Sequence, residues 1–225
     1  KNFEKIKMTR PTWYVGRSDM DMFDVWMMSR MLNNCNRSIS NNIRYTVHED
    51  NPNYCDVDGV LYNKDKTALL CYPCDHDEYL RQKYGYEKEL YRDEVTPEYE
   101  RDIQTYVVPS TVKKLGEMCF NYANLRYIYL PEGLETIETL AVFKLHERVD
   151  EWGTTPSLID VYSYKGVAAD SHFTTQEALG EVYLSLPEGL EYIGSDAFAD
   201  CTNLSDVTLS PNTSTISFDA FWGCE

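Results

Sequence analysis

The residues with the clearest capacity for chemistry are Cys71 and Cys74, which are separated by Tyr-Pro and followed by the acidic run 75–78 that contains His76. A Cys-x-x-Cys pair beside such side chains is typical of a metal site or a redox-active dithiol. A second Cys-x-x-Cys pair, which a four-cysteine zinc site needs, is absent from the sequence. We therefore expect this spacing to be coincidental and predict no metal and no cofactor. Metal-assisted catalysis by Cys71, Cys74 and His76 is the alternative.

Other catalytic patterns are absent from the sequence. The four histidines are dispersed, and no His-Glu-x-x-His, Gly-x-Ser-x-Gly, Walker or Gly-x-Gly-x-x-Gly pattern occurs. Asp56-x-Asp58-Gly59 has the start of a calcium loop but lacks the later acidic ligands of an EF-hand. We expect Asp58-Gly59 to form a turn instead. The sequence predicts no catalytic residues and a protein that is not an enzyme.

A different part of the chain repeats its own sequence. One overlay has a shift of 22 residues, and a second has a shift of 23 residues. A repeat of this length buries its apolar face only by stacking on copies of itself, so it predicts a solenoid. The coincident pairs are Tyr106/Ile128, Val108/Leu130, Pro109/Pro131, Val112/Leu134 and Leu115/Ile137, then Leu184/Val207, Leu186/Leu209, Ile193/Ile216, Ala197/Ala220, Phe198/Phe221 and Cys201/Cys224.

The fullest copy, VYLSLPEGLEYIGSDAFADCTNL, resembles the BspA-like leucine-rich-repeat family, whose unit reads roughly L-x-x-I-x-I-P-x-x-V-x-x-I-G-x-x-A-F-x-x-C. Residues 46–73 are similar to the hairpin segment that often accompanies these repeats. The resemblance covers roughly 44–75 and 106–225. It implies a bacterial protein that is secreted or surface-attached, and some members of the family act as adhesins.

The expected fold class is an α/β repeat, a leucine-rich-repeat solenoid of 22–23-residue units with short parallel strands. Residues 106–225 are expected to form about five turns, the third of them degenerate, because Pro131 and Pro187 are 56 residues apart. Apolar residues alternate with polar ones before each proline, which favours strands facing inward at every second residue. We expect parallel strands near 106–108, 127–130, 160–163, 182–186 and 206–209.

Two further segments precede the solenoid. Residues 1–43 are expected to be a helical capping segment or a worn repeat, with a helix that begins after Ser18. Residues 44–105 are expected to be the hairpin segment with an acidic, tyrosine-rich insertion at 76–105. The insertion is either a solvated helix and loop packed on the side of the solenoid through Leu80, Tyr84 and Leu90/Tyr91, or a protrusion that binds a partner.

The outward positions of the expected strands are the candidate binding residues. Four of the eight are tyrosines, and rigid amphipathic side chains of this kind suit contact with a protein or a glycan. The alternative is ordinary β-propensity on an exposed face. The eight candidates are Tyr127, Tyr129, Asp160, Tyr162, Tyr183, Ser185, Asp206 and Thr208.

The net charge narrows the class of partner, and the cysteine count limits disulfide pairing. The net charge of −16 argues against nucleic acid, because phosphate binding needs a basic face. Seven cysteines cannot all pair. Cys201 and Cys224 should stack on neighbouring turns, where they either bridge or, as we expect, remain small buried thiols.

We expect a non-enzymatic, monomeric interaction module, located outside the cell or on its surface with its signal peptide removed. Its partner would be an extracellular or host protein, or a glycan. No run of residues approaches the ~20 apolar residues of a membrane span. A structural stalk that presents another domain is the alternative function.

Overall fold

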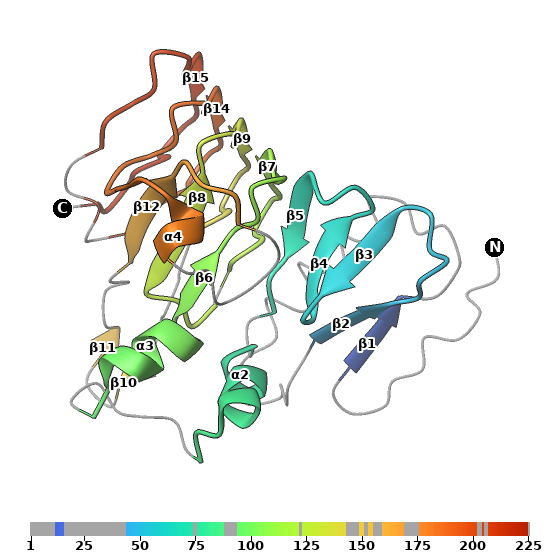
Figure 1. The fold of residues 1–225 in the computed structure, drawn as a ribbon. Coiled ribbons are helices and arrows are strands. Elements are labelled where there is room, and N and C mark those ends of the chain that lie inside the picture. The colour runs from blue at the N-terminus through green and yellow to red at the C-terminus, as the bar shows by residue number, and fades with distance from the viewer. Residues whose placement is uncertain are drawn as a thin grey trace.

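The computed structural model describes most of the 225-residue chain, and two sheets of stacked rungs form its body (Figure 1). The helix expected after Ser18 lies outside the described residues. The described residues are 12–15, 44–73, 76–87, 94–121, 123–142, 149–150, 153–154, 159–168, 176–201, 204 and 207–224.

A seven-stranded sheet runs the length of the molecule in the order β15-β14-β9-β7-β5-β4-β3. Its repeat strands are two residues long and pair in parallel, with Leu115 beside Ile137, Ile137 beside Ile193, and Ile193 beside Ile216. The shifts of 22 and 23 residues therefore correspond to neighbouring turns. These strands are β7 (Lys114–Leu115), β9 (Thr136–Ile137), β14 (Tyr192–Ile193) and β15 (Thr215–Ile216).

A four-stranded sheet in the order β13-β12-β8-β6 forms the second row of rungs in Figure 1. β6, β8 and β12 pair in parallel, as expected from the sequence, and Ile128 stands in register with Tyr106 and Val161. The strands are β6 (Thr105–Val107), β8 (Tyr127–Pro131), β12 (Asp160–Tyr164) and β13 (Val182–Tyr183).

The main core lies between the two sheets. The inward positions of the turns that contain β6 to β9 are buried, as the expected alternation requires, whereas Leu209 and Ile216 of the last described turn are each 44% exposed. Ile128 and Leu130 come from the four-stranded sheet, Leu134 follows in the turn, and Ile137 belongs to the seven-stranded sheet. Phe198 closes the far side of its turn, also fully buried. Side chains that are equivalent in sequence therefore form continuous apolar ladders.

The hairpin caps the solenoid and continues its sheet. β3 (Tyr54–Val57), β4 (Val60–Asn63) and β5 (Ala68–Cys71) pair antiparallel in chain order, and β5 then pairs parallel with β7. Asp58 and Gly59 have positive φ angles of 50° and 86°, which confirms the turn expected there. Tyr62, Leu69 and Tyr72 join the main core. The hairpin thus covers apolar surface that the first turn would otherwise expose.

Two helices of the insertion support the lower end of the solenoid in Figure 1. α2 spans His76–Tyr84, and α3 spans Pro97–Ile103. α3 begins after Thr96, whose side chain accepts a hydrogen bond from the Tyr99 N–H. Leu80, Tyr99 and Ile103 form a small buried cluster, with Tyr84 and Tyr86 packed on it.

The smaller elements are peripheral. α4 (Gln176–Leu179) lies over the four-stranded sheet, β1 (Thr12–Val15) pairs parallel with β2 (Arg44–Val47), and β10 (Val149–Asp150) pairs antiparallel with β11 (Gly153–Thr154).

The parallel strand expected at 182–186 is wrong. β13 ends at Tyr183 and pairs antiparallel with β12, and Leu184 is 64% exposed. The cause is local, because the chain turns back after β12 and bonds to itself: Gly166 N–H donates to Leu179 O at 2.7 Å. A Cβ on Gly166 would lie 1.8 Å from Ala178 O, so only glycine permits this close return. Residues 207–209 form no strand.

We predict that Gly189→Ala destabilises the chain, whereas Gly133→Ala does not. The two glycines are equivalent, but a Cβ on Gly189 would lie 2.5 Å from the backbone oxygen of Glu132, and one on Gly133 would meet nothing within 4 Å. Separating two stacked turns should cost about 1–3 kcal/mol. Urea unfolding midpoints of both variants measure this difference. Equal midpoints would show that the turns tolerate the extra atom.

We predict that Phe198→Ala costs about 3–5 kcal/mol, because rigid stacked turns cannot collapse into the cavity. Phe198 is fully buried and stacks on Phe221, with ring centroids 5.4 Å apart and planes within 2°. Phe221→Ala should cost less, because Phe221 is only partly buried. Guanidinium unfolding of the two variants tests the order. A larger loss for Phe221→Ala would contradict the packing argument.

Candidate functional site

Four of the eight candidate binding residues gather on the outer face of the four-stranded sheet. Tyr127 and Tyr129 alternate with inward residues on β8, and Asp160 and Tyr162 do so on β12. The parallel register places Tyr127 beside Asp160 and Tyr129 beside Tyr162. All four are partly exposed. We call Tyr127, Tyr129, Asp160 and Tyr162 the tyrosine face.

The rings of the tyrosine face pack on one another. Tyr129 and Tyr162 are stacked, with centroids 5.0 Å apart and planes 16° apart. Tyr127 approaches Tyr162 more obliquely, with centroids 6.4 Å apart and planes 39° apart. Contact with Val107, Tyr164 and their neighbours further restricts Tyr129. The rings are thereby held in fixed positions before any partner arrives.

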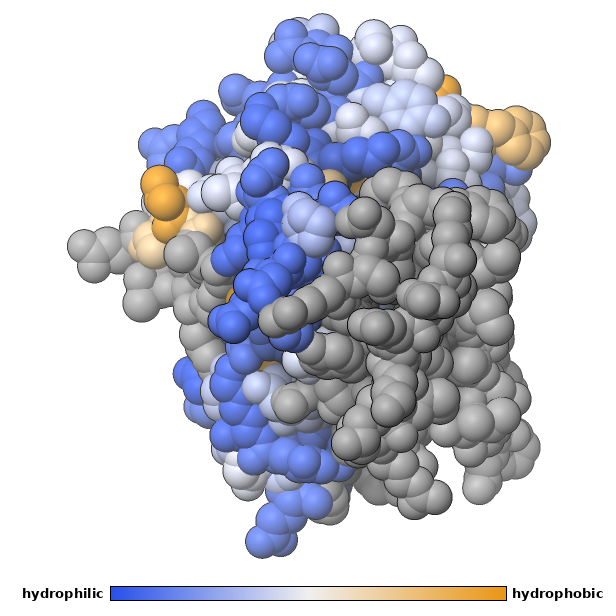
Figure 2. Space-filling view, turned by 90° about the vertical axis from the view of Figure 1, so that its right-hand side faces the viewer, coloured by the Kyte–Doolittle hydropathy of each residue, from blue (hydrophilic) through white to orange (hydrophobic). Residues whose placement is uncertain are grey.

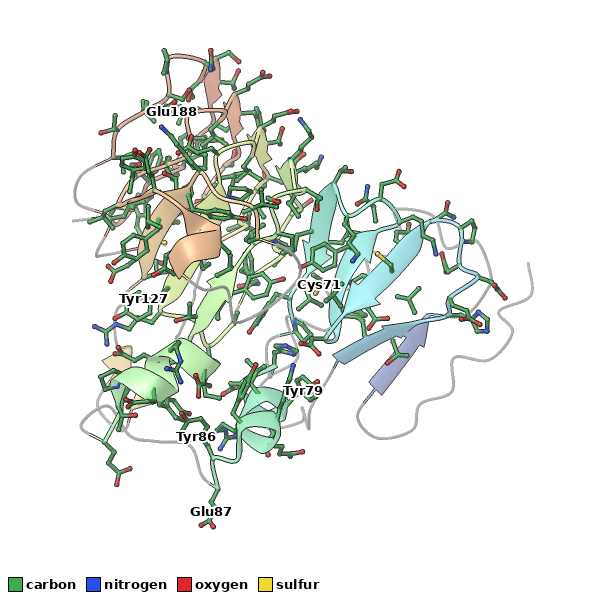
Figure 3. The ribbon with its side chains drawn as sticks, in the orientation of Figure 1. Cys71, Tyr79, Tyr86, Glu87, Tyr127 and Glu188 are labelled. Atoms are coloured by element: carbon green, nitrogen blue, oxygen red, sulfur yellow. The ribbon has the colours of Figure 1, made fainter. Side chains whose placement is uncertain are left out.

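Helix α3 fixes the lower rim of the face, where Tyr127 lies beside the helix (Figure 3). The Tyr127 hydroxyl donates to Glu100 Oε2 at 3.2 Å, and Arg126 forms an ion pair with the same carboxylate. The Arg126 guanidinium also lies over the Tyr127 ring, 5.3 Å from its centroid. Sequence reasoning missed Glu100 and Arg126. Their pairing joins residues 26 positions apart, and no local pattern signals it.

The return from β12 covers the upper part of the same sheet face. Tyr164 is fully buried, although it occupies an outward position, and its hydroxyl donates to Val108 O at 2.6 Å. Val107, Ala168 and Leu179 complete this second small core. The tyrosine face therefore lies between α3 and the segment that returns from β12 through α4 to β13, which we call the α4 hairpin.

The tyrosines of the face remain protonated at neutral pH. Burial raises the pKa of Tyr129, and the nearby Tyr162 and Asp160 raise it further. Burial is also the main cause of the raised pKa of Tyr162, followed by the charge of Asp160. For Tyr127, burial raises the pKa, Arg126 lowers it and Glu100 raises it, with a net upward shift. The face thus offers neutral hydroxyl groups beside carboxylates.

The other candidate residues do not join this face. Ser163, an inward-facing and buried residue, stands opposite Tyr183, and directly opposed residues of an antiparallel pair share one face of a sheet. Ser185 follows the same side, since its Oγ lies 3.2 Å from Ser163 Oγ. The antiparallel return therefore reverses the alternation assumed from the repeat. Thr208 is exposed outside any strand, and Asp206 lies outside the described residues.

The residues around Cys71 are buried and pack against tyrosine side chains. Cys71 is fully buried, and its sulfur accepts a hydrogen bond from the Tyr45 hydroxyl at 3.2 Å. His76 is buried against the rings of Tyr72 and Tyr79, with centroid distances of 5.0 Å and 5.2 Å. Cys74 lies outside the described residues. Within the described part of the chain, no three His, Cys, Asp or Glu side chains are grouped as metal ligands.

The two aspartates of the suggested calcium loop serve the fold. The Asp56 carboxylate accepts a hydrogen bond from the Val47 N–H at 2.7 Å. Asp58 forms an ion pair with Lys83 at 2.6 Å and accepts a hydrogen bond from the Tyr79 hydroxyl at 3.2 Å. These contacts tie the hairpin to β2 and α2.

The family model of the BspA type leucine-rich repeat region matches residues 98–152 and 170–225 in six copies. This chain carries a BspA-type leucine-rich-repeat region. The match agrees with the two rows of stacked, mostly parallel rungs, so the fold is the leucine-rich-repeat solenoid that the sequence indicated. None of the helices among the described residues is long and apolar enough to cross a membrane.

Solved structures of bacterial leucine-rich-repeat proteins are similar to the chain. A leucine-rich repeat protein from Eubacterium ventriosum has 21% identity and a TM-score of 0.49, with 80% of this chain and 33% of that chain covered. A leucine-rich cell surface protein from Faecalibacterium prausnitzii has 17% identity and a TM-score of 0.47, with 82% and 34% covered. The pneumococcal vaccine antigen PcpA has 22% identity and a TM-score of 0.42, with 81% and 39% covered.

This chain spans between a third and two fifths of the length of these solved chains. Comparison with curated proteins finds no match.

We predict that Tyr164→Phe weakens the alkaline loss of stability. Burial raises the pKa of Tyr164 far above its ordinary value near 10. The folded chain then holds a proton that the unfolded chain releases, so stability is lost as pH rises above about 10. Phenylalanine removes this loss. The urea midpoints of the two proteins, measured between pH 8 and 11, should converge as pH rises. A constant difference would contradict the assignment.

Proposed function

We propose that this chain is a non-enzymatic, extracellular, adhesin-like module that binds another protein through its tyrosine face. The observation that carries the proposal is the set of three tyrosines held on neighbouring rigid strands, with Tyr129 and Tyr162 stacked. Tyrosine is enriched among residues that dominate protein interfaces, and a preordered ring loses little entropy on binding. The BspA-type repeat supports a role in interaction.

The arrangement of the rings favours a protein partner over a glycan. Tyr129 and Tyr162 use their facing ring surfaces on each other, and the Arg126 guanidinium lies over the Tyr127 ring. A sugar packs best on an open aromatic face, and these contacts already occupy one face of each ring. The tyrosine hydroxyl groups suit the amides and side chains of a polypeptide.

The acidic insertion is the competing surface, and its contacts favour a supporting role. Tyr99 and Ile103 are almost completely buried, and Glu100 is used on Arg126 and Tyr127. The hydroxyl of Tyr86 donates to Asp102 at 2.9 Å, and burial together with this bond raises the pKa of Tyr86 to about 12. The insertion thus holds the rim of the tyrosine face in place.

The surface on the hairpin side, the family resemblance and the net charge also bear on the choice of partner and setting. Figure 2 shows a mainly hydrophilic described surface on the side of the hairpin, with apolar colour limited to small marginal areas. Members of the BspA-like family are typically secreted or surface-attached in bacteria, which supports the extracellular setting. The net charge of −16 keeps such a chain soluble and makes nucleic acid an unsuitable partner.

We predict that Tyr129→Ala combined with Tyr162→Ala lowers partner affinity about tenfold or more. Labelled chain is titrated onto host epithelial cells and onto neighbouring bacterial cells, and binding is measured by flow cytometry. Trypsin treatment of the cells should abolish binding, and glycosidase treatment should not. The matched control is Tyr183→Ala, which removes a 41%-exposed tyrosine from the other face. Normal binding by the double variant, or no binding by the unmodified chain, would reject the proposal.

A second comparison tests the insertion without removing its buried residues. Glu87 and Glu98 are exposed acids of the insertion, and Glu87 projects away from the body in Figure 3. We expect Glu87→Gln combined with Glu98→Gln to bind normally, and we expect binding to change little between low and moderate salt. Loss of binding in this variant, or steep dissociation by salt, would assign recognition to the insertion.

A further inference from the structure

Two cysteines meet at the corner of the last two turns. Backbone bonds fix the register there: the Phe198 N–H donates to Ala220 O at 2.8 Å, and the Asp200 N–H donates to Trp222 O at 2.7 Å. The next corner position in each turn is a cysteine, Cys201 in one and Cys224 in the other. The nearly coplanar stacking of Phe198 on Phe221 shows that side chains at this repeat spacing lie directly over one another.

The two thiols differ in exposure. Cys201 is fully buried, with its Sγ 3.7 Å from Val142 O, whereas Cys224 is partly exposed. The Cys224 thiol points back toward the turn of Cys201, because its Sγ lies 3.2 Å from Phe198 O. Both thiols are free in this structure. Cys224 is therefore partly open to solvent, and Cys201 is not.

The spacing suits a covalent bond. Stacked turns lie about 4.8 Å apart, and the Cα atoms of a disulfide are usually about 4.4–6.8 Å apart. Because a spacing of about 4.8 Å falls inside that range, a bridge needs only rotation of the two side chains. Ile216, Phe218 and Trp222 of the last described turn are 44–78% exposed.

We propose that Cys201 and Cys224 form a disulfide when the chain meets a low-molecular-weight disulfide such as oxidised glutathione. The bond fastens the last described turn to the turn before it. It does not depend on the proposed partner or on the tyrosine face.

The exchange balances in two steps. The Cys224 thiolate attacks one sulfur of oxidised glutathione, which forms a mixed disulfide and releases one glutathione thiolate. The Cys201 thiolate then attacks the Cys224 sulfur and releases the second glutathione. Two protein thiols are oxidised, and one glutathione disulfide is reduced to two thiols. Burial raises the pKa of both cysteine thiols, so the exchange should be faster above neutral pH.

Cys71 and Cys119 provide an internal control. Both are fully buried, and the Tyr72 N–H donates to Cys119 O at 2.7 Å, so the two cysteines lie on neighbouring segments. The sulfur of Cys71 accepts the hydrogen bond from Tyr45, and neither thiol is open to an incoming disulfide. These two thiols should therefore stay reduced in the folded chain.

The test uses the 225-residue chain with serine in place of Cys35, Cys55 and Cys74, so that the two buried or stacked pairs alone remain. The folded protein is equilibrated with oxidised and reduced glutathione, alkylated, and analysed by intact mass and peptide mapping. We expect loss of two hydrogen atoms and one cross-linked peptide pair containing residues 201 and 224. Chymotryptic cleavage after Phe218 and Trp222 should slow severalfold.

Cys224→Ser is the control variant, because Cys224 is partly exposed and its replacement leaves the buried Cys201 in place. It should show neither the cross-link nor the slower cleavage. A product that stops at glutathionylated Cys224, or a chain whose two thiols both remain alkylatable, would overturn the proposal. A cross-link between Cys71 and Cys119 instead would also overturn it.

Discussion

Main-chain hydrogen bonds between successive turns constrain everything else in this structure. An equivalent bond recurs along the seven-stranded sheet. In each case the residue that directly follows a repeat strand donates its N–H to a carbonyl of the preceding strand in the stack. The bonds are Gly116 to Leu69 at 2.8 Å, Glu138 to Leu115 at 3.0 Å, Gly194 to Ile137 at 2.7 Å and Ser217 to Ile193 at 2.9 Å. Among these four residues, Gly194 shows a position that requires glycine, because a Cβ there would lie 2.4 Å from Thr139 N.

The same ladder explains how the chain accommodates a long interruption. The bond from Gly194 to Ile137 joins two turns that are more than 50 residues apart in the sequence. β14 therefore pairs directly with β9, and the seven-stranded sheet continues without a gap. The intervening residues add β12 to the other sheet only and then return through α4 and β13. The apolar core of the repeat is therefore continuous, and β12, α4 and β13 are added at the four-stranded sheet.

The addition of β12 and its flanking segments forms the tyrosine face. β12 brings Asp160 and Tyr162 beside β8, α3 supplies Glu100 at one rim, and the α4 hairpin buries Tyr164 at the other. Neither α3 nor the α4 hairpin belongs to the repeat pattern. The segments that border the proposed binding surface are therefore specific to this chain's sequence and are not shared between its turns. A rigid ladder of turns holding a bordered aromatic surface is a sound physical basis for protein recognition.

The sequence by itself determined the repeat. The ladders at Ile128, Ile137 and Ile193 and the pairing of β6, β8 and β12 follow from periodic apolar residues, whose burial requires stacking. The turn at Asp58-Gly59 follows from its Asp-Gly pair. Only the tertiary structure decided the direction of β13, the opposite face of Tyr183 and the burial of Tyr164. These depend on the close return at Gly166 and on contacts such as Arg126 with Glu100, which join distant residues. Periodicity identifies the positions that are equivalent in every turn of the repeat. Contacts such as Arg126 with Glu100 involve residues that occur in one turn or segment only, so periodicity cannot predict them.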